Sequence, residues 1–291
     1  MARSANSDTH GRAFEHETVR LLLECGVRPH QHTVAYQRRD EAKLQACEEV
    51  VRSRLKQVAP RVVKWIEQQT SPLPELLVER LGDTATEVAD IRILRGNAEV
   101  LSISMKFNHQ ALRHPRPYSL AQACGFAKGS AQDSQHRVGM SGAIQPLVSD
   151  AKKSGLTEFR QLSDATRTRM YSGVVNTCAQ SIKEWSSKAS AEVPQKLFRF
   201  IVCPGLGFYK IIAGKDDGDP VLVQDFRKFD MPTTVAIACV DQYLHLKFDN
   251  KWEIRMRLHS ASSNICTSGR QISLKFDALR IAGAIPCVSL P

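Results

Sequence analysis

The chain contains no run of about 18 or more apolar residues, the length that a membrane-spanning helix needs. Residues 1–12 are polar and lack the apolar stretch of a secretory signal. We therefore expect a cytoplasmic protein with no membrane partner. The 291 residues, of which 42% are hydrophobic, provide ample material for a buried core.

The chain also lacks any CxxC pair among its eight cysteines. Zinc clusters and dense disulfide frameworks usually need closer spacing or a shorter chain. We therefore expect reduced thiols that are mostly buried as small hydrophobic residues.

Acidic residues are absent from residues 100–132, a stretch that contains four Lys or Arg residues and two histidines. The whole chain has a net charge of +10 and a pI near 9.3. Positive charge favours polyanions, because their binding releases condensed counterions. Many basic loops are merely solvated, so charge alone does not decide between a nucleic-acid partner and an exposed loop.

Helices and strands alternate irregularly in the predicted pattern. Apolar residues at helical spacing predict helices at residues 11–25, 41–68 (with a kink or break at Pro60), 75–81, 119–128 and 150–187. Alternating or β-branched runs predict strands at residues 87–94, 99–107, 196–203, 207–213, 235–240, 243–248, 252–258 and 273–279. This order indicates an α/β or mixed α+β fold. We expect a single domain over residues 1–291, with a helical insertion at 130–195 and C-terminal strands at 234–291.

The two strands on either side of residues 95–97 place polar groups on one side of a predicted hairpin. Side chains alternate between the two faces of a strand, so Asp90 falls on the face opposite Ile91 and Ile93. On the next strand, Ser104 and Lys106 alternate with apolar residues in the same way. If both apolar faces point to the core, Asp90 and Lys106 emerge on the same side.

This pattern suits metal-dependent cleavage of a phosphodiester, although Asp and Lys at such spacing are common. Cleavage requires neutralisation of the phosphate charge, a nucleophilic water and stabilisation of the leaving oxygen. Mg²⁺ prefers hard oxygen ligands, which the Asp90 carboxylate and the Met105 backbone carbonyl would supply. Lys106 would orient the water or help to deprotonate it.

Ser104 is the weak position, because a second carboxylate would be a better metal ligand there. Glu15 on the first predicted helix, or Glu87 on the first strand, would supply the missing charge. A single-metal nuclease with His109 as general base is an alternative, but no Cys or His cluster at metal-binding spacing supports it.

Two regions are candidates for contacting DNA. The first follows the predicted hairpin, where phosphate contacts are expected from Asn108, His109, Arg113, His114 and Arg116. The second is residues 251–276, which contain five Lys or Arg residues and one carboxylate. Contacts that read DNA bases are expected there from Arg255, Arg257, Ser262, Asn264 and Arg270. An exposed sheet face with a polar loop explains the second pattern equally well.

Five blocks of the sequence resemble the HaeIII-type restriction endonucleases. They are GRAFE (residues 11–15), SISMKFNHQALRHPRP (102–117), GFYK (207–210), RLHSASS (257–263) and SLKFD (273–277). The second block is long and specific, whereas the others are short. Together they occur in the family's order and span nearly the whole chain.

The resemblance implies a type II restriction endonuclease with a PD-(D/E)xK core, in which helices flank a central mixed sheet. It implies Mg²⁺-dependent cleavage of double-stranded DNA, with GGCC cut to blunt ends as the family's best-known site, and a partner DNA methyltransferase. It assigns Asp90 to the metal-binding acid, Lys106 to the motif lysine and Glu15 to the first-helix glutamate. Ser104 stands where the wider fold group carries Asp or Glu, which leaves the number of metal ions open.

Two competing interpretations stay open at the level of the sequence. One is a catalytically inactive, sequence-specific DNA-binding protein on the same fold. The other is a nuclease directed at RNA. For the restriction enzyme, a palindromic site would favour a homodimer, because each subunit would then cut one strand.

Overall fold

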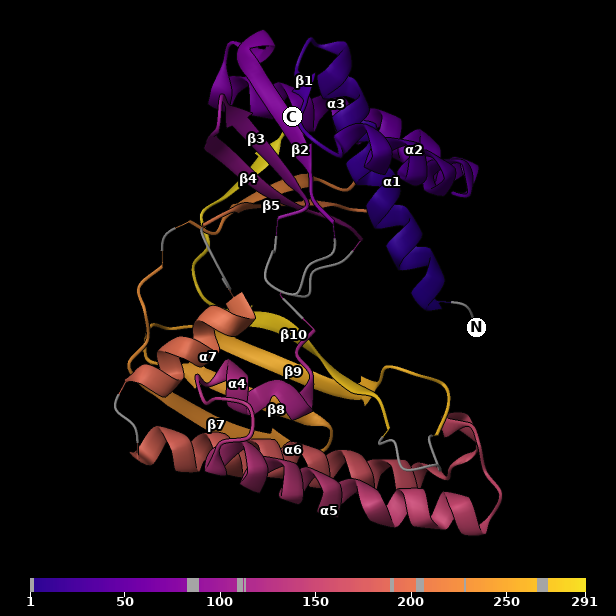
Figure 1. Ribbon diagram of the computed structural model, residues 1–291, viewed down its shortest axis with the longest axis vertical. Helices are drawn as coiled ribbons and strands as arrows, with labels where there is room; N and C mark the ends of the chain where they lie inside the picture. Colours follow the sequence, from indigo (N-terminus) through magenta and orange to yellow (C-terminus); the bar gives the residue numbers. More distant parts are fainter. Residues whose placement is uncertain are drawn as a thin grey trace. The chain divides into compact units, whose positions relative to one another are not determined.

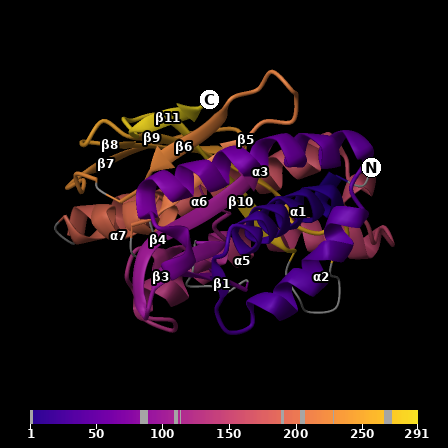
Figure 2. The ribbon, with the colours of Figure 1, turned by 90° about the horizontal axis from the view of Figure 1, so that it is seen from above.

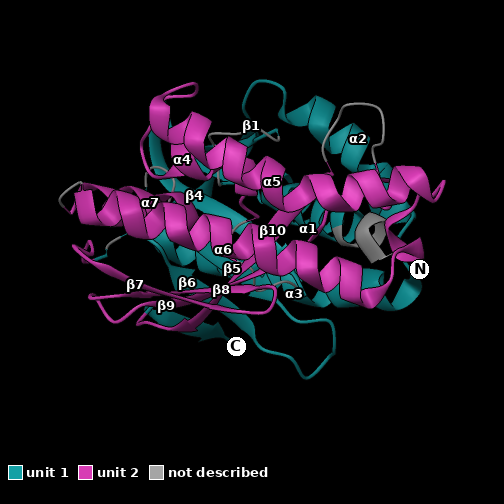
Figure 3. Cartoon of the chain, turned by 90° about the horizontal axis from the view of Figure 1, so that it is seen from below, with its two compact units in different colours: residues 1–110, 203–229, 285–291 teal, residues 111–202, 230–284 magenta. Residues whose placement is uncertain are grey.

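The computed structural model combines helices with two β-sheets, which confirms the mixed α and β class expected from the sequence (Figure 1). It describes residues 3–82, 89–108, 112, 114–188, 191–202, 207–227, 229–265 and 272–291. The chain divides into two compact units (Figure 3). Unit 1 comprises Met1–Gln110, Cys203–Phe229 and Ile285–Pro291, and unit 2 comprises Ala111–Val202 and Asp230–Ala284.

Unit 1 is a mixed sheet with helices. The helices are α1 (Arg3–Glu24), α2 (Thr33–Gln45), α3 (Glu49–Thr70) and the 3-10 turn η1 (Leu73–Glu75). The strands are β1 (Arg28–Pro29), β2 (Leu76–Arg80), β3 (Ile91–Arg95), β4 (Ala98–Phe107), β5 (Tyr209–Ala213), β6 (Val221–Asp225) and β11 (Cys287–Leu290). Their order is β1-β2-β3-β4-β5-β6-β11, with parallel pairing in β1–β2 and β4–β5 and antiparallel pairing elsewhere.

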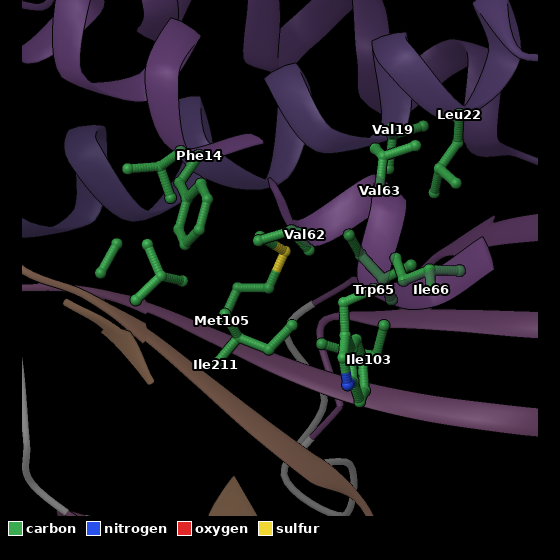
Figure 4. Close-up of a cluster of buried hydrophobic side chains, with 14 of the residues drawn as sticks. Phe14, Val19, Leu22, Val62, Val63, Trp65, Ile66, Ile103, Met105 and Ile211 are labelled. Carbon is green, nitrogen blue, oxygen red and sulfur yellow. The ribbon is translucent and has the colours of Figure 1, made fainter. Parts of the chain in front are cut away.

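The core of unit 1 forms where α1 and α3 pack against β4 and β5. Apolar residues recur along α3 at Leu55, Val58, Val62 and Ile66, a spacing that gives the helix one buried side. Side chains of β4 alternate, so Met105 faces these helices (Figure 4). In the view of Figure 2, α1 and α3 lie side by side. The polar residues between the apolar ones are thereby turned to the other face of the sheet.

Unit 2 is an antiparallel sheet covered by helices on one side. The helical elements are η2 (Pro117–Ser119), α4 (Leu120–Ala123), α5 (Ala131–Lys153), η3 (Phe159–Gln161), α6 (Asp164–Lys188) and α7 (Glu192–Val202). The strands are β7 (Val235–Val240), β8 (Tyr243–Phe248), β9 (Glu253–Ser260) and β10 (Leu274–Ala282). Their order is β10-β9-β8-β7, and every pairing is antiparallel.

Close helix packing holds unit 2 together. A Cβ atom on Gly139 of α5 would lie 2.8 Å from the Cγ2 atom of Thr177 on α6, so glycine permits the approach of these two helices. On the sheet side, the Phe198 ring of α7 contacts Phe248 and Trp252 edge-on, at centroid distances of 5.2 and 5.3 Å. The apolar face of the sheet is therefore buried, and the alternate residues are directed away from the helices.

Two predicted elements have the wrong type. Residues 196–203 were expected as a strand but lie mostly in helix α7, because Val193, Leu197 and Ile201 recur every four residues and are all buried. Residues 75–81 were expected as a helix but form β2, in which Leu76 and Val78 alternate with more exposed side chains. Short apolar runs fit both periods, and tertiary packing decided between them.

The break in the second predicted helical region also lies elsewhere. Pro60 is inside α3, and the interruption falls between α2 and α3 at residues 46–48. Proline removes one helical hydrogen bond, but the flanking Val58 and Val62 are completely buried and hold the helix in place. The hairpin of β3 and β4 was predicted, but its first strand begins later than expected: β3 starts at Ile91, residues 89–90 precede it, and residues 87–88 lie outside the described part of the chain.

The sequence suggested one domain with a helical insertion at 130–195 and C-terminal strands at 234–291. In the structure, α5, α6 and the start of α7 occupy the first range, and β7–β10 occupy the second. Together they form most of unit 2, whereas β11 pairs with β6 in unit 1. No helix in the described part of the chain is long and apolar enough to cross a membrane.

Candidate functional site

Asp90 lies immediately before β3, and its side chain is fixed by three donors from β4. Its Oδ2 atom accepts hydrogen bonds from the Ser104 hydroxyl at 3.2 Å, the Met105 backbone N–H at 2.6 Å and the Lys106 Nζ at 3.1 Å. The backbone of Asp90 is also held, because its N–H donates to the Ile103 carbonyl at 2.7 Å. The structure thus brings together all four residues of the predicted hairpin site.

The exposure of these side chains suits a surface site. The Asp90 side chain is 18% exposed and the Lys106 side chain 31%, whereas Ser104 is buried. A ligand at the surface can therefore reach the carboxylate and the ammonium group, while Ser104 orients the carboxylate from below. This gives Ser104 a role that does not require it to bind metal.

Glu15 lies in a buried ion-pair cluster that sequence reasoning did not anticipate. Arg80 contacts the carboxylates of both Glu15 and Asp40, the latter at 3.2 Å, and all three side chains are buried. Arg12 approaches Glu15 from the same helix at 3.3 Å. The metal-ligand role expected of Glu15 stays a prediction, but the structure shows a competing role as the counterion of two guanidinium groups.

The same cluster supports Asp90 through its backbone. Arg80 donates from Nη1 to the Asp90 carbonyl at 3.1 Å, and also to the carbonyl of Leu81. The Leu81 N–H donates to the Asp90 carbonyl at 3.0 Å. The segment that carries the candidate catalytic carboxylate is therefore attached to a charged cluster inside unit 1.

Few side chains near Asp90 could bind a divalent metal ion. Among the described residues, no group of three or more His, Cys, Asp or Glu side chains could hold a metal ion. Glu87, the second predicted helper, lies outside the described residues. Mg²⁺ often binds through one or two carboxylates, with waters and substrate phosphates completing its shell. Asp90 alone therefore fits an ion that a substrate phosphate would help to hold, but not a preformed protein cage.

No protein-family model, curated protein or solved structure matches the chain. The chemistry of the site therefore has to be judged from its own geometry.

Lys210 is a candidate site residue that the sequence did not single out. It lies on β5, is only 3% exposed, and pairs in parallel register with Ser104 of β4. Neighbouring strands are about 4.8 Å apart, and paired residues point to the same face. Lys210 therefore shares a sheet face with Ser104 and Lys106. The GFYK block contains it, but only the pairing of β4 with β5 connects it to Asp90.

The predicted DNA-contacting residues fall into both units. Asn108 follows the last residue of β4 in unit 1, with a left-handed φ of 52° and its N–H donating to the Ala213 carbonyl at 2.8 Å. The members in unit 2 are His114, Arg116, Arg255, Arg257, Ser262 and Asn264. The members outside the described residues are His109, Arg113 and Arg270.

In unit 2, Asp277 of β10 joins two histidines. Its Oδ1 atom lies 2.7 Å from His114 Nδ1, and its Oδ2 atom lies 3.0 Å from His259 Nε2. Burial lowers the pKa of His114, and the negative charge of Asp277 only partly opposes this shift. Burial would raise the pKa of Asp277, but the hydrogen bond from His259 and the two histidines together lower it. Another predicted residue, Arg116, donates to the Ser273 hydroxyl at 3.0 Å.

Proposed function

We propose that the protein is a Mg²⁺-dependent endonuclease that hydrolyses phosphodiester bonds of double-stranded DNA, as the resemblance to the HaeIII-type enzymes implies. The observation that carries this proposal is the Asp90–Lys106 contact of 3.1 Å at the surface of the β3–β4 hairpin. A carboxylate and a lysine on adjacent strands provide one group for a metal and one for a water. The carboxylate-free stretch after Lys106 supports a polyanionic substrate.

The roles of the residues follow from their contacts. Asp90 would hold Mg²⁺ together with an oxygen of the DNA phosphate, and the ion would neutralise charge at the scissile group. Lys106 positions the attacking water from the adjacent strand. Ser104 and the Met105 N–H fix the orientation of the Asp90 carboxylate. Lys210 adds a second, buried ammonium group on the same sheet face, and its charge would act on the phosphate from inside the sheet.

The finer points of the proposal rest on the resemblance. They are cleavage of GGCC to blunt ends, a homodimer that matches a palindromic site, a partner DNA methyltransferase and a cytoplasmic location. A two-fold dimer would place one copy of the Asp90 site on each strand of such a site.

The direct test is incubation of supercoiled plasmid DNA with the protein, with and without Mg²⁺. We expect discrete fragments only with the metal, and sequencing of the ends defines the site. Lys106→Ala should slow cleavage by about 10²–10⁴-fold, the contribution typical of a positioned acid–base group. The matched control is Lys64→Ala, which removes an exposed lysine from α3 of the same unit and should leave the rate unchanged. A Lys106→Ala variant that cuts at full rate contradicts the mechanism.

The second candidate function is sequence-specific DNA binding without catalysis. The absence of a group of three metal-binding side chains among the described residues favours it. In the same assay it predicts a gel shift with intact plasmid at every Mg²⁺ concentration. Degradation of RNA with duplex DNA left intact would instead indicate a nuclease of different specificity.

A further inference from the structure

The face of the β7–β10 sheet that points away from the helices carries basic side chains in register. Paired positions across the strands bring His245 beside Arg255, and place Arg257 between Tyr243 on β8 and Asp277 on β10. One register step further, His259 pairs with Lys275. These side chains are exposed or half-buried, whereas the alternate residues of the same strands are buried. We call this surface the basic sheet face.

Its carboxylates are already paired, which leaves an excess of positive charge. Glu253 binds Lys247 at 2.7 Å, and Asp277 is shared by His114 and His259. No carboxylate among the described residues forms an ion pair with the cations that remain, which are Arg255, Arg257 and Lys275. Three unpaired cations on one face are complementary to an array of phosphates.

Arg255 gives this face a donor without a partner. Its guanidinium lies 5.5 Å from the centre of the Tyr243 ring, which holds it against the sheet. Its Nε atom is buried and has no hydrogen-bond partner among the described residues. Leaving such a donor unpaired is unfavourable. Because this atom is enclosed, a phosphate at the surface would contact the terminal amino groups of the guanidinium instead.

A further basic segment lies along the outer edge of β10, the last strand of the sheet. The Leu112 N–H donates to the Ala278 carbonyl at 2.7 Å, and the Phe276 N–H donates to the Pro115 carbonyl at 2.9 Å. These contacts place His114 against Asp277 and bring Arg116 to the end of β10. The exposed Arg116 therefore extends the positive surface past the last strand of the sheet.

We propose that the basic sheet face of unit 2 binds the phosphate backbone of duplex DNA. Single-stranded nucleic acid is typically bound by several aromatic side chains on which bases stack. Tyr243 is the one Phe, Tyr or Trp residue on the described part of this face. Charge without stacking platforms favours backbone contacts to a duplex. The inference rests on the proposed function and assigns its substrate-holding surface.

The test measures binding separately from cleavage. Fluorescence anisotropy of a 5′-labelled random duplex of about 30 base pairs is recorded in EDTA at several NaCl concentrations, where backbone contacts dominate. The variant is Arg255→Gln with Arg257→Gln. The matched control is Lys152→Gln with Lys153→Gln, which removes the same charge from the exposed end of α5 in the same unit. Circular dichroism melting verifies that all proteins are folded.

We expect the Arg255/Arg257 variant to bind about tenfold more weakly per arginine near 0.1 M salt, with a salt dependence lower by roughly 0.9 per lost contact. The control should bind within about twofold of the unchanged protein. Equal affinities for the two variants would overturn the inference, as would tighter binding of a single-stranded DNA or RNA probe of the same length.

A parallel plasmid digest with Mg²⁺ separates this inference from the proposed function. If the unchanged protein cuts and the Arg255/Arg257 variant binds and cuts equally well, the basic sheet face is not the binding surface and the nuclease proposal stands. If the basic sheet face binds duplex in the anisotropy assay but no cleavage occurs, the nuclease proposal fails and the surface assignment stands.

Discussion

Replacement of Arg80 by methionine tests whether the charged cluster beneath Asp90 supports the fold. The guanidinium is about 1% exposed and contacts two carboxylates, those of Glu15 and Asp40, which are 5% and 0% exposed. Removing one partner of a buried ion pair costs about 3–5 kcal/mol, because the other charge stays buried without compensation. We expect Arg80→Met to lower the free energy of unfolding of unit 1 by this amount at pH 7.

The matched control is Arg39→Met. Arg39 contacts the same carboxylate of Asp40 at 3.0 Å, but its own side chain is 52% exposed. Solvent screens such a pair, so its loss should cost about 1 kcal/mol or less. Any difference between the two variants therefore reports the burial of Arg80 and not the mere loss of a charge near Asp40.

Urea unfolding followed by far-UV circular dichroism gives the free energies. Hydrogen-exchange mass spectrometry of peptides from β3 and β4 assigns the transition to unit 1. Addition of Asp40→Asn and Glu15→Gln to Arg80→Met should restore much of the loss, because the unpaired charges are then removed. If Arg80→Met and Arg39→Met are equally mild, the buried cluster does not stabilise the site and the reasoning is refuted.

Three further predictions concern the site and the pH dependence of stability. Asp90→Asn should abolish plasmid cleavage in Mg²⁺. Glu15→Gln, measured on protein shown to be folded, should retain most of the cleavage rate, because Glu15 acts as a counterion. Equal losses of rate in the two variants would make both residues metal ligands. Lys210→Arg should retain more activity than Lys210→Met, since the arginine keeps the charge, and equal rates in both would show that Lys210 does not contact the phosphate. The Arg137 hydrogen bond lowers the pKa of Asp133 to about 2. The stability that this carboxylate contributes is therefore present above about pH 4 and is lost between about pH 4 and 2. When the melting temperature is measured against pH, Asp133→Asn should remove the decrease in stability between these two pH values.

The hairpin was predictable because its pattern is local. Asp90, Ser104 and Lys106 take their faces from alternation with apolar neighbours. A register shift between Ile93 and Leu94 separates the pairing next to the turn at residues 95–97 from the pairing at the site, where Ile91 lies opposite Ile103. The same local logic misassigned α7, where aromatic and β-branched residues resemble a strand although they recur at a helical period.

The remaining features of the site depend on contacts between distant segments. Arg80 lies 65 positions after Glu15, and nothing in either local pattern indicates that they meet. Lys210 joins Ser104 only through the parallel pairing of β4 with β5. Such a pairing requires a long crossover connection, which here contains most of unit 2. Sequence periodicity does not reveal the partner of a strand across such a separation.

The discontinuity of unit 1 has a consequence for when the proposed site is completed during synthesis. Asp90 and Lys106 are made early, but β5, which carries Lys210, follows about a hundred residues later, and β11 completes the sheet only at Cys287–Leu290. Domains assemble on the ribosome only as their segments emerge, so the nascent chain holds half a site while α5, α6 and α7 are being added. If the protein cuts DNA, it would stay inactive until β5 and β11 have left the ribosome and completed the sheet of unit 1.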